Sequence, residues 1–319
     1  MEDGRNFKNL RPLKRSIAKL GLAGLILGLA VENSLGAAPD ALEGDAAAGA
    51  EKFITGELKI GMGAVTRSDI GDSGSSYGLV GSTIDMEAGP LIGSMKRLEF
   101  DWSAPESFVE NTNGDDPWGS LNSITLGLKH KGLFSEELMY EATAGMISGY
   151  EDEMDDSFTA FVGGYAIYAI APRWAVMLGA FYSRHQEVET DFDFIPILGL
   201  SWNSEAVEGF SLALGLPTTE AIWHFSEATR LILDLSSLEG GVYRLADDNQ
   251  LREEGYVELV SATASLRIEM RIPGGFDLGL GICHALDREM KLYDSNGENE
   301  LSHNVENQPG FSINLKRSF

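Results

Sequence analysis

The chain has 319 residues, with 24 Lys and Arg residues against 49 Asp and Glu residues and a formal net charge of −25. Such an acidic chain lacks the basic face that nucleic-acid binding requires, which excludes that class of partner. Hydrophobic residues make up 43% and Cys283 is the only cysteine, so neither a helical membrane protein nor an intramolecular disulfide framework is predicted.

The N-terminus has the composition of an export signal. Six basic residues between Arg5 and Lys19 precede an apolar run at 20–31, and small residues follow at 34–38. This order of basic, apolar and small residues is typical of a cleaved signal peptide. A transmembrane helix needs about 20 apolar residues, and this run is shorter. We therefore expect a signal peptide over 1–37, a flexible linker over 38–52 and one domain over 53–319.

Most later segments alternate apolar residues with small or polar ones. In 119–131, Leu126 and Leu128 share one face and Lys129 lies on the other. A period of two predicts strands, because a helix would mix the two sets. We expect fourteen strands, near 53–66, 76–88, 93–103, 119–131, 135–149, 155–170, 172–187, 190–202, 207–216, 218–225, 228–246, 254–272, 275–293 and 304–319. Pro217 predicts that the hairpin at 207–225 is short.

Three features favour a membrane barrel over a soluble sandwich. The predicted strands are about 10 to 18 residues long, whereas soluble strands usually have 5 or 6 residues and membrane strands need about 9–11. Brief connections such as 171–173 alternate with longer acidic ones such as 104–118, as periplasmic turns alternate with extracellular loops. The small-residue faces also carry charges. The predicted fold is an all-β transmembrane antiparallel β-barrel of about 14 strands, with 12–16 possible, in the bacterial outer membrane.

Charged residues on the small-residue faces are the candidates for a lumen lining. The segment 261–272 has the most regular alternation, with Leu266 and Ile268 on one face and Arg267 and Glu269 on the other. Charges of both signs in a lumen predict modest ion selectivity. The candidates are Lys129, Glu141, Asp234, Arg267, Glu269 and Arg271.

The last strand ends on an aromatic residue. Phe311, Ile313, Leu315 and Phe319 share one face, which resembles the assembly signal of outer-membrane barrels and implies recognition by the barrel-assembly machinery. Arg317 on the same face departs from that signal. Its cost is about 0–1 kcal/mol near a membrane interface.

From about Phe194 the chain resembles an uncharacterised family of outer-membrane proteins of unknown function, over roughly its last 125 residues. The residues that carry the resemblance are Ile195–Asn203, Leu214–Pro217, Gly240–Arg244 and Leu315–Phe319. The resemblance implies a barrel and provides no catalytic residues.

No motif indicates catalysis, a cofactor or a metal centre. The five histidines have no metal-ligand spacing, and the pair Ser183 and His185 on one face is weak support for a lipid hydrolase. The loop 294–300 has its glycine at the fourth position, not the sixth that an EF-hand requires. The protein is therefore predicted to be a passive channel or envelope component rather than an enzyme.

Two alternatives remain open at this stage. The first is a structural or adhesive barrel with a plugged lumen, whose acidic loops bind a partner, or bind lipopolysaccharide through divalent cations. The second is an outer-membrane enzyme that acts on lipids. The sequence leaves the oligomeric state open.

Overall fold

The computed structural model describes residues 56–108, 116–190, 193–204, 209–249, 251 and 253–319. The predicted signal peptide and linker therefore lie outside the described residues. In these ranges the helical structure is one 3-10 turn at Pro105–Ser107. No helix in them is long and apolar enough to cross a membrane.

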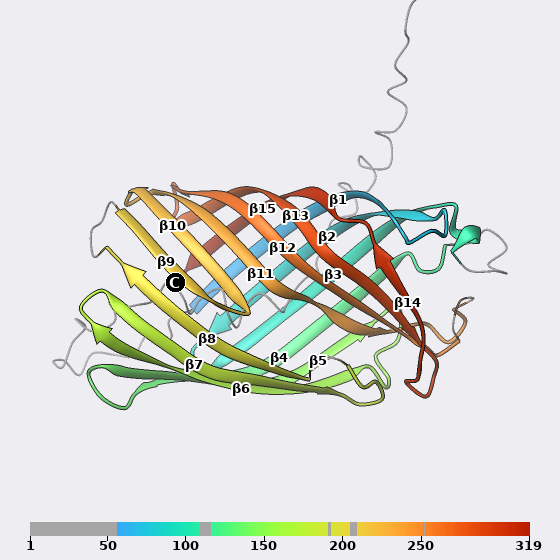
Figure 1. Ribbon diagram of the computed structural model, residues 1–319, viewed down its shortest axis with the longest axis horizontal. Coiled ribbons are helices and arrows are strands. Elements are labelled where there is room, and N and C mark those ends of the chain that lie inside the picture. Colours follow the sequence, from blue (N-terminus) through green and yellow to red (C-terminus); the bar gives the residue numbers. More distant parts are fainter. Residues whose placement is uncertain (1–55, 109–115, 191–192, 205–208, 250, 252) are drawn as a thin grey trace, which may run out of the picture.

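The described residues form one sheet of fifteen strands (Figure 1). They are β1 (Gly56–Asp69), β2 (Ser76–Ala88), β3 (Leu91–Ser103), β4 (Ser120–Leu133), β5 (Leu138–Tyr150), β6 (Phe158–Ala171), β7 (Trp174–His185), β8 (Phe194–Asn203), β9 (Gly209–Leu216), β10 (Thr218–Ser226), β11 (Thr229–Arg244), β12 (Tyr256–Ile272), β13 (Phe276–Tyr293), β14 (Asn299–Val305) and β15 (Gln308–Ser318).

The sheet closes into an antiparallel barrel with fourteen strand positions. Closure comes from pairing of β1 with β15 and of β12 with β13. β14 and β15 occupy one position, because both pair with β13 in a continuous register, from Arg288↔Val305 to Ala285↔Gln308. The predicted barrel of about 14 strands is confirmed.

The two ends of the barrel differ. Both described chain ends lie at one end, because Glu57 pairs with Ser318, and we call it the terminal end. Its connections are short, such as 89–90, 172–173 and 273–275. The opposite end, called the loop end, has the longer connections 104–119 and 245–255.

The strands expose apolar side chains on one face and bury small or polar ones on the other. Leu126 of β4 is 68% exposed, whereas its neighbour Thr125 is 0% exposed. A closed barrel hides its inner face, so the leucine face is the outer wall. Near the terminal end, exposed aromatic side chains also gather on the outer wall: Phe134, Tyr168, Trp174, Trp223, Phe225 and Phe319.

This polarity reverses toward the loop end. On β3, Leu98, Phe100 and Trp102 are buried inside, while the intervening residues form ion pairs on the outer wall, such as Arg97–Glu99 at 3.1 Å. The loop half of β3 thus has a polar outside and an apolar inside, as a soluble protein does, whereas Val162, Tyr182 and Phe194 keep the outside of β6, β7 and β8 apolar.

One hairpin is shorter than its neighbours. β9 stops at Leu216, opposite Leu198 of β8, and β10 starts at Thr218, opposite Ser236 of β11. Both neighbours continue toward the loop end, as Figure 1 shows for the yellow hairpin between β8 and β11. The shortness predicted from Pro217 is confirmed, and it leaves the adjoining edges of β8 and β11 without a β9 or β10 partner toward the loop end.

Candidate functional site

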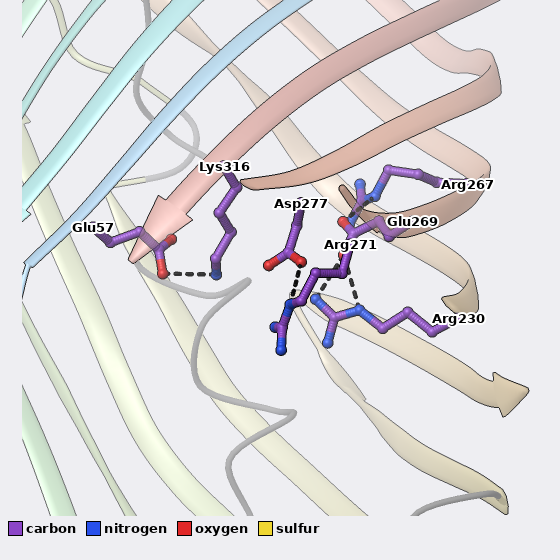
Figure 2. A network of polar contacts seen from close by, with 7 residues as sticks. All are labelled: Glu57, Arg230, Arg267, Glu269, Arg271, Asp277 and Lys316. Carbon is purple, nitrogen blue, oxygen red and sulfur yellow. Dashed lines mark hydrogen bonds and ion pairs between the residues drawn. The ribbon is translucent and has the colours of Figure 1, made fainter. Parts of the chain in front are cut away.

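Ion pairs line the inner wall near the terminal end (Figure 2). Glu269 of β12 accepts hydrogen bonds from Arg230 Nε and Nη2 of β11, at 2.8 and 2.6 Å, and from Arg267 Nε at 2.9 Å. One carboxylate therefore serves two guanidinium groups. The trio carries one net positive charge on the inner wall.

Two further pairs lie closer to the mouth at the terminal end (Figure 2). Arg271 Nε donates to Asp277 Oδ1 at 3.1 Å across the β12–β13 turn. Lys316 Nζ lies 2.7 Å from Glu57 Oε2, which links β15 to β1. The Arg271 side chain is 62% exposed, so water reaches this part of the wall.

A second set of inner charges lies on β2, β4, β5 and β11. Lys129 forms an ion pair with Glu87, and Lys131 Nζ lies 3.1 Å from Glu141 Oε2. Lys129 and Glu141 are buried, as is Asp234 of β11. Each of these charges lies on the face opposite the exposed apolar side chains of its strand, which are Met86, Leu128, Met146 and Leu235.

The six lumen candidates are thus distributed over four strands. Arg267 and Glu269 contact each other. Four partners of the candidates were missed: Glu87 of Lys129, Lys131 of Glu141, Arg230 of Glu269, and Asp277 of Arg271. The alternation along each strand would have placed these partners on the small-residue faces. Which charges become neighbours depends on strand register, and register cannot be read from the sequence.

The final strand shows the predicted exposed face. Phe311, Ile313 and Phe319 are exposed, and Leu315 is half-buried. The Arg317 guanidinium lies 4.9 Å from the Phe276 ring centroid, so the departure from the apolar pattern is stabilised by a cation–π contact. A Cβ at Gly56 would lie 2.4 Å from the Phe319 ring, so a larger residue there would require the Phe319 side chain to move.

An apolar cluster fills the inside of the loop half, and we call it the aromatic core. Its indole and phenyl rings pack closely, with Trp102 and Trp118 centroids 5.2 Å apart and Trp102 Nε1 donating to Trp118 O at 2.8 Å. It also contains residues from the long connections. The members are Ile70, Tyr77, Leu98, Phe100, Trp102, Phe108, Trp118, Leu121, Tyr243, Leu245, Leu251, Val257, Met290, Leu292 and Val305.

The segment after β11 is fastened across the barrel. Glu151 Oε2 accepts hydrogen bonds from Ala246 N at 3.0 Å and Asn249 Nδ2 at 2.9 Å. Arg244 of β11 also pairs with Tyr150 of β5. Burial raises the pKa of the Glu151 carboxyl, and the two hydrogen bonds oppose that shift. These contacts hold the end of β11 against β5.

A pocket of about 110 Å³ lies beside the aromatic core. Its lining combines Tyr243 of the core and Leu259, which packs against the core, with Lys96 and Ser123 from β3 and β4. Ile195 of β8 and Val242 of β11 line it as well. The pocket therefore adjoins the two strands that the short hairpin leaves apart.

The described residues contain no cluster of three or more His, Cys, Asp or Glu side chains that could hold a metal ion. In the predicted acidic loop, Asp294 Oδ1 accepts hydrogen bonds from the N–H groups of Asn296 and Glu298 at 2.8 and 3.0 Å. This carboxylate therefore holds the turn together.

A scan against family models and a search of curated proteins found no match. Solved structures that resemble the chain include the "KdgM porin", at 9% identity and a TM-score of 0.35, covering 82% of this chain and 99% of that one. Another is the COG4313 outer membrane channel from Pseudomonas putida F1, at 12% identity and a TM-score of 0.39, covering 83% and 95%. A third is the P. putida toluene transporter TodX, at 9% identity and a TM-score of 0.41, covering 83% and 90%. With identities and TM-scores this low, the substrates of these channels cannot be assigned to this chain. The resemblance to an uncharacterised family stays a prediction.

Proposed function

We propose that this chain is a passive channel of the bacterial outer membrane. The observation that carries the proposal is the charged inner wall at the terminal end. Inner side chains of both signs remain partly exposed there, including the cations Arg271 and Arg230 and the anion Glu87. Charged groups in a packed core would be buried, whereas a water-filled lumen leaves them hydrated.

The outer wall supports the membrane location. Its exposed leucines form an apolar band, and the aromatic side chains near the terminal end correspond to the girdle found at a membrane interface. In hydrocarbon, closure of the sheet satisfies the backbone hydrogen bonds. The terminal end then faces the periplasm, and the C-terminal strand is the segment that the assembly machinery would recognise.

The test is single-channel recording of the purified protein in a planar bilayer at neutral pH, with and without calcium. We expect discrete conductance steps with weak ion selectivity, since the inner charges are mixed. A correctly inserted, heat-modifiable barrel that gives no steps would contradict an open channel.

A second candidate function is a plugged structural or adhesive barrel with its loops as the working surface. The aromatic core favours it, because this core fills the inside of the loop half. A plugged barrel is silent in the same recording, and Leu121→Ala, which opens the core, would then produce conductance. Lipopolysaccharide bound through divalent cations would be a partner of those loops, detected as calcium-dependent retention of the lipid.

A further inference from the structure

The wall of the barrel has a gap above the short hairpin. Beyond Leu216 and Thr218, no described strand pairs with the edges of β8 at 194–197 and of β11 at 239–241 that the hairpin leaves free. From Val242 onward the β11 edge lies against β5, where Arg244 pairs with Tyr150. Backbone groups at membrane depth must be satisfied, so irregular backbone occurs there only when it is buried or lines a cavity. An unpaired pair of edges therefore marks a place where the wall borders internal space.

The pocket lies behind this gap. Ile195 lines it from the β8 edge, and Gly241 and Val242 line it from the β11 edge. A Cβ at Gly241 would meet only the Tyr243 ring, at 3.5 Å, so there is space beside this edge. Four exposed apolar side chains surround the gap on the outer wall: Phe194, Leu198, Leu216 and Leu235. The pocket thus adjoins the lipid-facing surface.

The inner side of the pocket provides two hydrogen-bond donors, and the one carboxylate in its lining, Glu258, is already bound by Tyr293 Oη at 2.7 Å and lies 3.7 Å from Lys291 Nζ. Lys96 lines it, and its ammonium forms no ion pair or hydrogen bond with the residues that the structure describes. His185 lines it too, and its Nδ1 accepts hydrogen bonds from the N–H groups of Glu187 and Val188, both at 3.1 Å. The ring proton is therefore on Nε2, and that buried N–H has no acceptor among the described residues.

We propose that this pocket binds an amphipathic carboxylate that enters sideways from the lipid. Its apolar tail lies between β8 and β11, beside Phe181 and Ile195, and its carboxylate pairs with Lys96. A cavity of about 150 Å³ holds one benzene, so the pocket accommodates the headgroup end and the tail extends through the gap.

The proposal rests on the proposed function only in placing the barrel in a membrane. The binding experiment involves no ionic current. A protein that conducts no ions would contradict the proposed channel, whereas a pocket that binds no ligand would contradict the proposed site.

The experiment uses the purified chain in lipid nanodiscs with octanoate carrying carbon-13 at the carboxyl, observed by NMR, and with octan-1-ol as the uncharged probe. We expect saturable octanoate binding above the level of empty nanodiscs. Lys96→Gln should weaken octanoate binding about tenfold, since a hydrogen bond to a charged group is lost, and change octan-1-ol binding less than twofold.

Gly241→Phe fills the pocket and should abolish binding of both probes. The matched control is Gly78→Phe on β2, where a Cβ has an ordinary 3.9 Å contact with Asp101 and which is not part of the pocket. If Gly241→Phe does not show the heat-modifiable gel mobility of a folded barrel, Ile195→Trp is used in its place to fill the pocket. Equal binding in wild type and both filled variants would overturn the site, and equal losses of both probes in Lys96→Gln would overturn the carboxylate assignment.

The sideways route has its own variant. Two added residues in each arm of the β9–β10 hairpin would cover the facing edges of β8 and β11. We expect octanoate uptake to be lost or slowed at least tenfold. Unchanged uptake in a folded variant would show that the ligand enters through the lumen instead.

Discussion

Glu269→Gln is the most direct test of the charged wall as an ion path. The substitution keeps the size of the side chain and its place between Arg230 and Arg267. It changes the trio from one net positive charge to two. Cations passing the trio are then repelled more strongly and anions are attracted more strongly.

The expected size follows from the added unit charge. At about 6 Å from an ion in water, one charge is worth about 0.7 kcal/mol, with opposite sign for cations and anions. The free-energy difference between anion and cation passage therefore changes by about 1.4 kcal/mol, which raises the permeability ratio of anions to cations about tenfold at low salt. At 0.1 M salt a Debye length of about 10 Å reduces this to roughly threefold, and at 1 M little remains.

The assay is the reversal potential of single channels under a potassium chloride gradient. Glu99→Gln is the matched control, because Glu99 forms a similar pair with Arg97 on the outer wall, at 3.1 Å. A conducting channel whose selectivity is the same in wild type and Glu269→Gln at low salt would refute the assignment of this trio to the ion path.

Three further predictions concern the loop half. Leu121→Ala, at a fully buried core position, should cost about 2–5 kcal/mol and lower the temperature at which the barrel loses its heat-modifiable gel mobility. Arg288→Met removes hydrogen bonds to Tyr77 Oη and Glu306 O, each 2.9 Å long, and should cost about 1–3 kcal/mol in the same assay, whereas an unchanged value would show that these bonds add nothing. The raised pKa of Glu151 contributes stability below pH 4.5 that is lost as the pH rises through the folded-state pKa. The stability of Glu151→Gln relative to the wild type should therefore increase as the pH rises. Stability profiles of the two proteins that run parallel against pH would contradict this.

Much of the fold followed from the alternation of residues. The period of two located most strands to within a few residues, because membrane strands are long and their turns contain Pro or Gly. It missed β14 at Asn299–Val305, most of which lies in a predicted connection. What alternation does not reveal is which face is inside. Leu98, Phe100 and Trp102 alternate just as Leu126 and Leu128 do, yet the first set is buried in the core and the second is exposed.

The site was harder to predict than the fold. Ion pairs such as Arg230–Glu269 join residues far apart in the chain, so they depend on strand register. The aromatic core draws Trp118, Leu245 and Leu251 from connections outside the strands, where no period exists. Pro217 signalled the short hairpin, but the pocket behind it requires β8, β11 and β3 to be placed together.

The reversal of polarity along the strands has a consequence for how the protein sits in a bilayer. Pairs such as Arg97–Glu99 and Arg67–Asp101 on the outer wall would be costly in hydrocarbon, and so would exposure of the leucine band to water. The boundary between the ion pairs and the leucine band fixes how deep the barrel lies in the bilayer, independently of strand length. A thicker bilayer would therefore have to thin around the protein, because deeper insertion would bury the ion pairs in hydrocarbon.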